Sequence, residues 1–191
     1  MTRDEAWAVL TEHTSNPSLL KHMLAVEAVM RAYARRFGED EETWGLVGLL
    51  HDMDYEKHPS REAGHPFKGV EVLRGRGLDE GLCRAILSHA DYSGVPRETV
   101  MEKALFAADE VSGFVIAVAL VKPSRALADV DVGSVKRKMK DKAFAKGVRR
   151  EDIVEGAAGL GVTLDDHLAT VIAALQPVAP QLGLDGTRNH A

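Results

Sequence analysis

Apolar residues recur at intervals of three and four positions along most of the chain, the spacing that places them on one face of an α-helix. No stretch alternates apolar and polar residues for long enough to predict a β-strand. Alanine, leucine, glutamate, lysine and arginine are abundant, and all five are good helix formers. The pattern therefore predicts an all-α fold.

Capping and helix-breaking residues divide this pattern into separate helices. Asn16 suits an N-cap and Pro17 suits the first position of a helix that ends before Gly38. Lys122 precedes Pro123 and ends the longest helix, because the residue before proline disfavours the α conformation. We predict helices over residues 4–13, 17–37, 39–52, 66–76, 79–90, 97–121, 150–160 and 163–175.

Composition narrows the class of protein. The 191 residues are 45% hydrophobic and 28% charged, which is typical of a globular chain of about one domain. The net charge of -5 excludes a uniformly basic nucleic-acid binder, so nucleic acid is not an expected partner. The single cysteine, Cys83, excludes an internal disulfide and a cysteine-rich zinc site. The N-terminus carries acids where a signal peptide is apolar, and the longest apolar run (114–121) is about half a bilayer span, so we predict a cytoplasmic protein without membrane contact.

The distribution of charge changes after Pro123. Residues 122–150 carry ten lysines and arginines against three aspartates, although the whole chain is acidic. We divide the chain into a first domain (1–121), a C-terminal helical extension packed on it (122–184) and a loose tail (185–191). Within the extension, Lys136, Arg137 and Lys138 are either a solvated helix face or a positive lip that attracts an anionic substrate.

Five predicted elements each direct a histidine or an aspartate toward the core. Apolar residues stand three or four positions away from His22, His51, His89 and Asp109, and His65 begins a helix with apolar residues on its side. For any one of these residues, a hydrogen-bonded core side chain is the ordinary interpretation. All five together would leave several buried polar groups without partners, which is energetically costly.

A metal centre satisfies these groups at once. Imidazole and carboxylate ligands without thiolate suit iron, manganese, zinc, nickel or cobalt. With Asp52, which follows His51 directly, the set contains four histidines and two aspartates. That number exceeds one tetrahedral site, so we predict two divalent metal ions that share a bridging carboxylate.

The same residues resemble a known family. The order H…HD…D, with His22 in LLKHMLAVEAVMRAYA, His51-Asp52 in LLHDMDYE and Asp109 in ALFAADEVSG, resembles the HD-domain superfamily of metal-dependent phosphohydrolases. His65 in GHPFKGVEVLRG and His89 in AILSHADYSGVP are similar to the two additional histidines of the binuclear HD subgroup. The chain departs from the cyclic-dinucleotide HD enzymes, because a serine precedes His89 where some of them have a second histidine, and it has no GYP signature. This departure argues against hydrolysis of cyclic di-GMP.

The resemblance covers residues 19–114, and the rest of the chain looks like the C-terminal extension of short predicted HD hydrolases. It implies an HD-domain helical bundle with a small helical extension. It also implies that one ion is held by His22, His51, Asp52 and Asp109, and that Asp52 bridges to a second ion completed by His65 and His89. The implied activity is hydrolysis, by metal-activated water, of a phosphomonoester or phosphodiester in a nucleotide-like small molecule.

Further candidates flank the HD pair. Asp54 is a candidate catalytic carboxylate that accepts a proton or orients a ligand, and its alternative is a solvated loop carboxylate. His58, Arg61 and Lys68 are candidates for binding the phosphate of the substrate. Glu27 falls off the face of His22 and is predicted to be solvated.

Two other functions share this residue pattern. A diiron HD-type oxygenase that cleaves a C–C or C–P bond would use the same six ligands, because metal identity and surrounding groups decide the redox behaviour. A non-catalytic HD ligand sensor would have lost ligands, whereas all six are present here. The apolar run at 114–121 is either part of the core or a face for a homo-oligomer.

Overall fold

Capping residues determine where the helices begin and end. In the computed structural model, which describes residues 1–186, Thr2 and Glu5 form a capping box. Asn16 caps the helix that starts at Pro17, and Gly38 ends it with a φ of 73°, which glycine adopts without strain. The described residues form helices and turns in the order α1 (Arg3–His13), α2 (Pro17–Phe37), α3 (Glu41–Leu50), α4 (Phe67–Gly75), α5 (Glu80–Ser88), η1 (Asp91–Ser93), α6 (Val100–Leu120), η2 (Leu127–Asp129), α7 (Val132–Lys140), α8 (Arg150–Gly159), α9 (Leu164–Leu175), η3 (Gln176–Val178) and α10 (Ala179–Leu182). The predicted all-α fold is confirmed.

Two predicted helices begin later than expected because a capping residue lies inside the predicted range. Asp40 accepts the backbone N–H of Thr43 at 2.7 Å, so α3 begins after Asp40 rather than at residue 39. Thr99 accepts the backbone N–H of Glu102, so α6 begins after Thr99 rather than at residue 97. The α3 helix also ends earlier than predicted, and His51 is its C-cap.

The extension contains a helix that the sequence pattern did not predict. Asp131 accepts the backbone N–H of Ser134 at 2.7 Å and begins α7, whose apolar pattern is too short to stand out among its lysines. The short α10 helix and the 3-10 turns were not predicted either. Asp185, at the start of the predicted loose tail, pairs with Ala126 in an isolated antiparallel bridge. The rest of that prediction, residues 187–191, lies outside the described residues.

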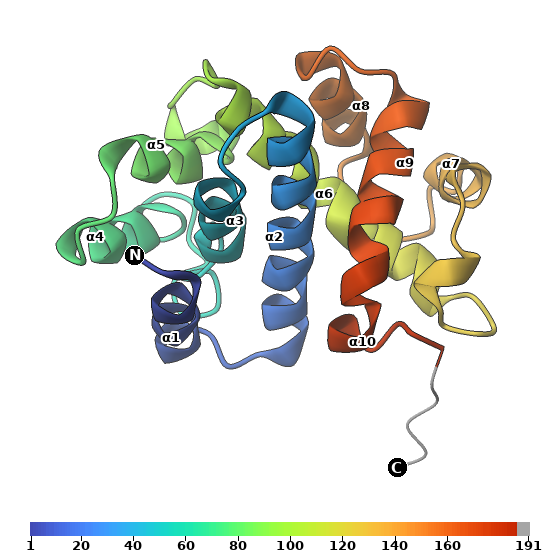
Figure 1. Cartoon of the computed structure of the whole chain (residues 1–191), viewed down its shortest axis with the longest axis horizontal. Coiled ribbons are helices and arrows are strands. Elements are labelled where there is room, and N and C mark those ends of the chain that lie inside the picture. Colours follow the sequence, from blue (N-terminus) through green and yellow to red (C-terminus); the bar gives the residue numbers. More distant parts are fainter. Residues whose placement is uncertain (187–191) are drawn as a thin grey trace.

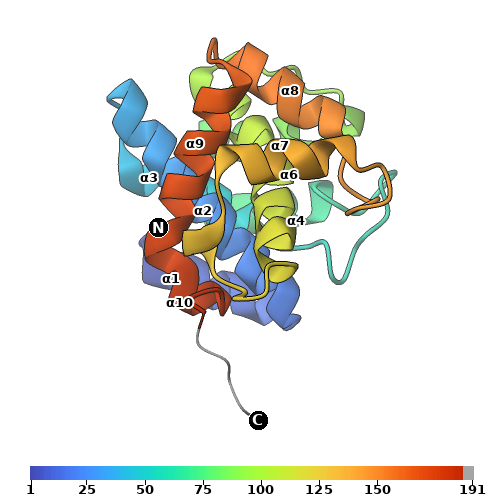
Figure 2. The same ribbon diagram turned by 90° about the vertical axis from the view of Figure 1, so that its right-hand side faces the viewer.

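The two longest helices, α2 and α6, form the centre of the molecule (Figure 1). On one side, α3 packs along α2, α1 packs against α3, and α5 contacts both α3 and α6. On the other side, α8 and α9 pack on α6, α9 also contacts α2, and α7 lies across α6 and α9 (Figure 2). The helices of the extension therefore cover the side of α2 and α6 that faces away from α3, α4 and α5.

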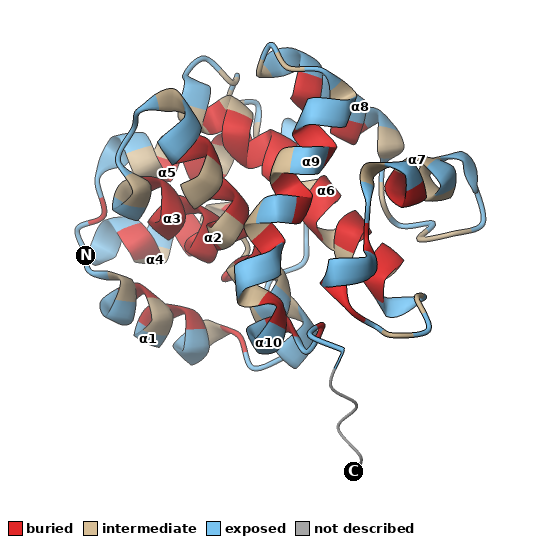
Figure 3. Ribbon diagram, turned by 45° about the vertical axis from the view of Figure 1, so that its right-hand side comes forward, coloured by how far each residue is buried: buried red, intermediate tan, exposed pale blue. Residues whose placement is uncertain are grey.

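Buried apolar residues from all of these layers form one continuous core, and the red parts of the ribbon in Figure 3 mark where buried residues lie along the helices. The α3 helix approaches α2 closely at Gly48, where a Cβ atom would lie 2.9 Å from the backbone oxygen of Val26. Most of the apolar run at 114–121 is core, as one of its two interpretations predicted, whereas Leu120 and Val121 remain exposed. No single helix in the described part of the chain is long and apolar enough to cross a membrane, and the one helix pair that qualifies jointly is bent by 99°.

Glu27 corrects an expectation from the sequence. It was predicted to be solvated, yet it is only 5% exposed. Arg3 donates to both of its carboxylate oxygens, at 2.7 and 2.9 Å, and Arg31 donates to one of them at 3.1 Å. A buried carboxylate is stable when it is paired and hydrogen-bonded in this way, so Glu27 joins α1 to α2.

Candidate metal centre

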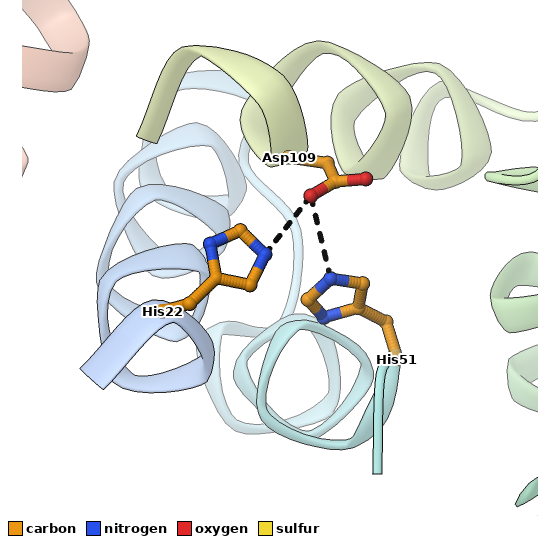
Figure 4. A group of neighbouring side chains, drawn as sticks. All are labelled: His22, His51 and Asp109. Atoms are coloured by element: carbon orange, nitrogen blue, oxygen red, sulfur yellow. Dashed lines mark hydrogen bonds and ion pairs between the residues drawn. The ribbon is translucent and has the colours of Figure 1, made fainter. Parts of the chain in front are cut away.

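Five elements bring the six predicted ligands to one place. His22 lies in α2 and Asp109 in α6, and these two side chains point toward each other across the bundle (Figure 4). The other ligands lie where helices end or begin: His51 and Asp52 directly after α3, His65 just before α4, and His89 directly after α5. The three histidines at these helix ends are buried, so the ligands meet inside the packed helices.

One ligand group involves α2, the end of α3, and α6. Asp109 Oδ1 lies 3.0 Å from His22 Nε2 and 3.5 Å from His51 Nε2. The three ligand atoms all lie within 4.8 Å of one another, so a single ion fits between them. This group matches three of the four residues predicted for the first ion.

The second group surrounds Asp52. Its Oδ1 atom lies 3.2 Å from His65 Nε2 and 3.5 Å from the Nε2 atoms of His51 and His89. Its Oδ2 atom faces the other way, 3.8 Å from His22 Nε2. Asp52 thus presents one oxygen to each side of the cluster, which is the arrangement that a bridging carboxylate needs.

The histidine tautomers show that the cluster is built for cations. His51 Nδ1 donates to the carbonyl of Gly48 at 2.8 Å, and His89 Nδ1 donates to the carbonyl of Ile86. Because a carbonyl only accepts, both Nδ1 atoms carry a proton, so Nε2 is the atom of each ring that presents a lone pair once a metal ion displaces any second proton. Ring nitrogens fixed in this way are typical of metal-binding histidines.

These Nε2 atoms are incompletely satisfied by the described residues. His51 Nε2 is buried and has no hydrogen-bond partner among the described residues. His65 Nε2 and His89 Nε2 lie 3.2 Å apart, with both Nδ1 atoms already engaged. Lone pairs that face one another beside carboxylates require a cation, so the residues present fit a divalent metal site.

The electrostatics of the cluster lead to the same conclusion. Burial alone would lower the pKa of His51, but the carboxylates of Asp52 and Asp109 outweigh it and raise this pKa to about 9. Burial would raise the pKa values of Asp52 and Asp109, yet the neighbouring imidazoles hold both well below the ordinary value. The carboxylates therefore stay charged and attract positive charge, whether from protons or from metal ions.

Asp54 lies behind the cluster. It is buried, and its two oxygens accept from His65 Nδ1 at 2.7 Å and from the backbone N–H of Gly69 at 2.6 Å. Its solvated-loop alternative is therefore wrong. Asp54 does not line the cleft described below, so the structure places it where it orients His65 rather than where it contacts a substrate.

An open cleft of about 540 Å³ leads to the cluster. Of the three residues predicted to bind phosphate, only Arg61 lines it. His58 is exposed beside Pro59 but does not itself line the cleft, and Lys68 is exposed and paired with Glu71 at 2.7 Å, so these two predictions do not fit the structure. The lining comprises His22, Asp52, Tyr55, Pro59, Arg61, His65, His89, Ala90, Asp91, Tyr92, Phe106, Asp109, Glu110, Gly113, Gly147, Val148, Arg149 and Asp152.

The predicted positive lip does not lie at this cleft. Lys136 pairs with Asp165 at 2.6 Å, and Lys138 lies over the ring of Phe144 at 4.7 Å. Neither these lysines nor Arg137 line the cleft. The solvated-face interpretation fits better, because α7 presents them on the outside of the extension.

The sequence analysis missed several residues of the cleft. Tyr55 and Tyr92 each stand three positions after a ligand, Asp52 and His89, and both are about two-fifths exposed. Tyr55 lies edge-on against the ring of His65 at 5.3 Å, and the guanidinium of Arg61 lies over the ring of Tyr92 at 5.5 Å. The shared spacing of three positions after a candidate ligand was the feature of the sequence that could have identified both tyrosines.

Two acidic residues also face the cleft. Glu110 follows Asp109 in α6, and burial together with the charges of Asp109 and Asp152 raises its pKa to about 7. Burial likewise raises the pKa of Asp152 at the start of α8. Nothing in the sequence pattern distinguished these acids from the many solvated ones.

A larger groove, about 730 Å³, lies between α1, α2 and the segment from α9 to α10, away from the metal ligands. Arginines 3, 31 and 35 line it, and each is paired with a glutamate, Glu27, Glu42 or Glu41. Because its charges are satisfied internally, this groove is not the candidate site.

The comparison with protein families agrees with this geometry. The family model of the HD domain matches residues 19–113, a range that contains all six ligands. No solved structure matches the chain.

Proposed function

The chain belongs to the HD-domain superfamily, and on that premise we propose that it is a phosphohydrolase that uses two divalent metal ions held by His22, His51, Asp52, His65, His89 and Asp109. When bound, such ions supply Lewis acidity that activates a water molecule and neutralises charge on the phosphate group. The observation that carries the proposal is the convergence of four Nε2 atoms and two carboxylates on one small space, with His51 Nε2 buried and without a hydrogen-bond partner among the described residues.

The residues around the ions have separate tasks in this proposal. Asp52 would hold both ions, since one of its oxygens lies beside His65 and the other is the nearer to His22. Asp54 holds His65 in the tautomer whose Nε2 faces the cluster. Asp109 and His22 close the cluster on the side of α2 and α6. The side chain of His51 is only 1% exposed, and its burial keeps bulk water from one side of the site.

We propose a nucleotide-like phosphate ester as the substrate. Arg61 lines the cleft and has no carboxylate partner within the described chain, so its guanidinium is free to bind a phosphate oxygen. The rings of Tyr55 and Tyr92 remain partly exposed beside it, and such rings stack on planar groups. A phosphate next to a planar base matches this combination.

Metal analysis combined with an activity screen tests the proposal. Protein purified without chelator should contain close to two metal ions per chain and release phosphate from nucleotides with Mn²⁺ in the absence of oxygen. His51→Ala should lose both metal and activity, whereas His58→Ala, which removes an exposed side chain that does not line the cleft, should keep both. Oxygen uptake with an organic substrate and no phosphate release would instead identify an oxygenase.

A further inference from the structure

One wall of the cleft comes from outside the matched HD domain. Gly147, Val148, Arg149 and Asp152 line the cleft, and all four belong to the C-terminal extension, beyond the family match at residues 19–113. They come from the loop before α8 and from its first turn. The residues that this wall presents are therefore particular to the extension, whereas the metal ligands are common to the domain.

Arg150 fixes this wall in place. Its guanidinium donates to the backbone carbonyls of Ala145 at 3.0 Å, Val148 at 2.7 Å and Asp141 at 3.3 Å, and also to that of Phe144. The same guanidinium lies over the ring of Phe114 in α6 at 5.3 Å. One side chain thus ties the loop at residues 141–148 to the central helix beside the cleft.

The α8 helix is seated on α6 independently of Arg150. A Cβ atom at Gly156 would lie 2.7 Å from the Cα atom of Ala107, so the two backbones are in close contact there. The first turn of α8 is therefore held from both directions, by the loop before it and by the packing after it. Arg149, between these two anchors, has a backbone position fixed relative to the metal cluster.

The side chain of Arg149 is loosely held by comparison. It is 62% exposed and lies 3.4 Å from Asp91 and 3.3 Å from Asp152. Arg97 contacts the same Asp91 at 2.8 Å, the usual length of a charge-assisted hydrogen bond. Arg149 is thus a cation at the rim whose present contacts a stronger anionic acceptor can replace.

We propose that Arg149 binds a second anionic group of the substrate, separate from the phosphate that reacts, and that Arg150 is the positioning residue that places it there. This inference rests on the proposed phosphohydrolase function. Arg149 contacts none of the six candidate ligands among the described residues, so it meets a part of the substrate away from the metal ions. The extension then selects among phosphate esters that the metal centre alone would treat alike.

A second phosphate and a carboxylate share the chemistry that Arg149 recognises, because both accept two parallel N–H donors. Two matched pairs of substrates distinguish whether Arg149 binds a second phosphate or a carboxylate. Adenosine 5′-monophosphate and adenosine 3′,5′-bisphosphate differ by one phosphate. Glycerol 3-phosphate and 3-phosphoglycerate differ in that one terminal alcohol is replaced by a carboxylate.

Steady-state kinetics of Arg149→Ala with Mn²⁺ on these four substrates tests the assignment. We expect KM to rise about 10- to 100-fold for the member of a pair that carries the second anion, with kcat and the KM of its partner changed less than about twofold. Arg149→Lys should restore part of the loss because it keeps the charge. Arg137→Ala, an exposed arginine of α7 away from the cleft, is the matched control.

Arg150→Lys tests the positioning role, since a lysine keeps the charge but cannot reach several carbonyls together. It should raise the same KM values and speed amide hydrogen exchange across residues 141–149. Unchanged KM and exchange would overturn this part of the inference.

Other outcomes separate the inference from the proposed function. Unchanged kinetics of Arg149→Ala, with active wild-type protein, would overturn the inference and leave the function in place. An equal loss on both members of a pair would assign Arg149 to the reacting phosphate and also overturn it. Wild-type protein that hydrolyses none of the four esters but binds the bisphosphate in equilibrium dialysis, with binding lost in Arg149→Ala, would overturn only the function.

Discussion

Two buried histidines of this protein have opposite environments. His51 and His167 are 1% and 0% exposed, so burial does not distinguish them. His167 is hydrogen-bonded through Nδ1 to the hydroxyl of Tyr33, between α9 and α2, and burial lowers its pKa to about 4. His51 stands among carboxylates, which overcome burial and raise its pKa to about 9.

The comparison separates a structural histidine from a ligand. The surroundings of His167 favour the neutral imidazole and join two helices through Tyr33. The Nε2 atoms of both rings are buried without a hydrogen-bond partner among the described residues, so the difference lies in the charges around them: the carboxylates beside His51 favour a positive imidazole. Burial away from charged groups keeps an imidazole neutral and suits a structural histidine, whereas burial among several carboxylates is typical of a site that binds a cation.

The largest effect on metal content and activity is expected at Asp52, which belongs to the same cluster as His51. Asp52→Ala removes the carboxylate that holds both ions in the proposed site, so metal content should fall below one ion per chain and phosphatase activity should fall by more than about 100-fold, a larger loss than that of a supporting residue. Elemental analysis and phosphate release measure the two quantities. A metal-replete and fully active Asp52→Ala protein would falsify the assignment.

Variants of His65 and His89 test how many metal ions the site holds. Each is expected to complete the second ion, so His65→Ala or His89→Ala should lower the metal content from about two toward one per chain. Elemental analysis of the two variants beside wild-type protein measures this change. If wild-type protein already holds a single ion and His65→Ala keeps it, the site is mononuclear.

Asp54→Asn tests the residue that supports His65. The amide can no longer provide the charged acceptor for the Nδ1–H of His65, so metal affinity should fall by about 10- to 100-fold with the fold intact. A metal titration monitored by calorimetry gives the affinity, and circular dichroism checks the fold. Unchanged affinity would show that His65 holds its orientation without Asp54.

His167→Ala tests whether His167 has a structural role. The loss of packing and of the partner of the buried Tyr33 hydroxyl should lower the free energy of unfolding by about 2–4 kcal/mol. Metal content should stay at the wild-type value because no candidate ligand contacts His167 among the described residues. Urea denaturation and elemental analysis together provide the test, and loss of metal with retained stability would reverse the roles of the two histidines.

The two histidines also predict opposite pH dependence of stability in metal-free protein. The folded-state pKa of His167 lies below the ordinary value of 6.5, so its protonation favours the unfolded chain and stability falls as pH decreases from about 6.5 to about 4. The full change is on the order of 3 kcal/mol. His51 has a raised pKa, so its contribution is present below pH 6.5 and is lost as pH rises through about 9.

Denaturation of wild-type protein, His167→Phe and His51→Ala across this pH range measures how the free energy of unfolding changes with pH on the acid side and on the alkaline side. His167→Phe should flatten the acid side alone, and His51→Ala should flatten the alkaline side. The same slopes in all three proteins would show that other groups control the pH dependence.

The smallest effect is expected on α7. Replacing Lys136, Arg137 and Lys138 together with alanine should change KM by less than about twofold, at low and high salt, because these residues do not line the cleft. Stability should change by less than about 1 kcal/mol, since the ion pair of Lys136 with Asp165 is exposed. A large rise of KM at low salt would instead support the interpretation of these residues as a positive lip that attracts an anionic substrate.

The sequence alone determined the helical fold and the six candidate ligands. Helical periodicity is local, so the positions of His22 and Asp109 on apolar faces are evident without a structure. Caps such as Asn16 and Gly38 act within a few residues and were read correctly. The α7 helix was missed because its apolar pattern is too short to stand out against its lysines.

Only the tertiary structure decided which neighbours each side chain meets. Glu27 was predicted to be solvated but pairs with Arg3, which lies 24 positions earlier in the chain. Arg149 reaches the cleft and Lys136 does not, although both belong to the same basic segment. The tautomers of His51 and His89 and the position of Asp54 behind His65 likewise depend on distances between atoms. Periodicity specifies the face of a helix, whereas packing brings together the groups whose charges, lone pairs and desolvation determine the chemistry of a site.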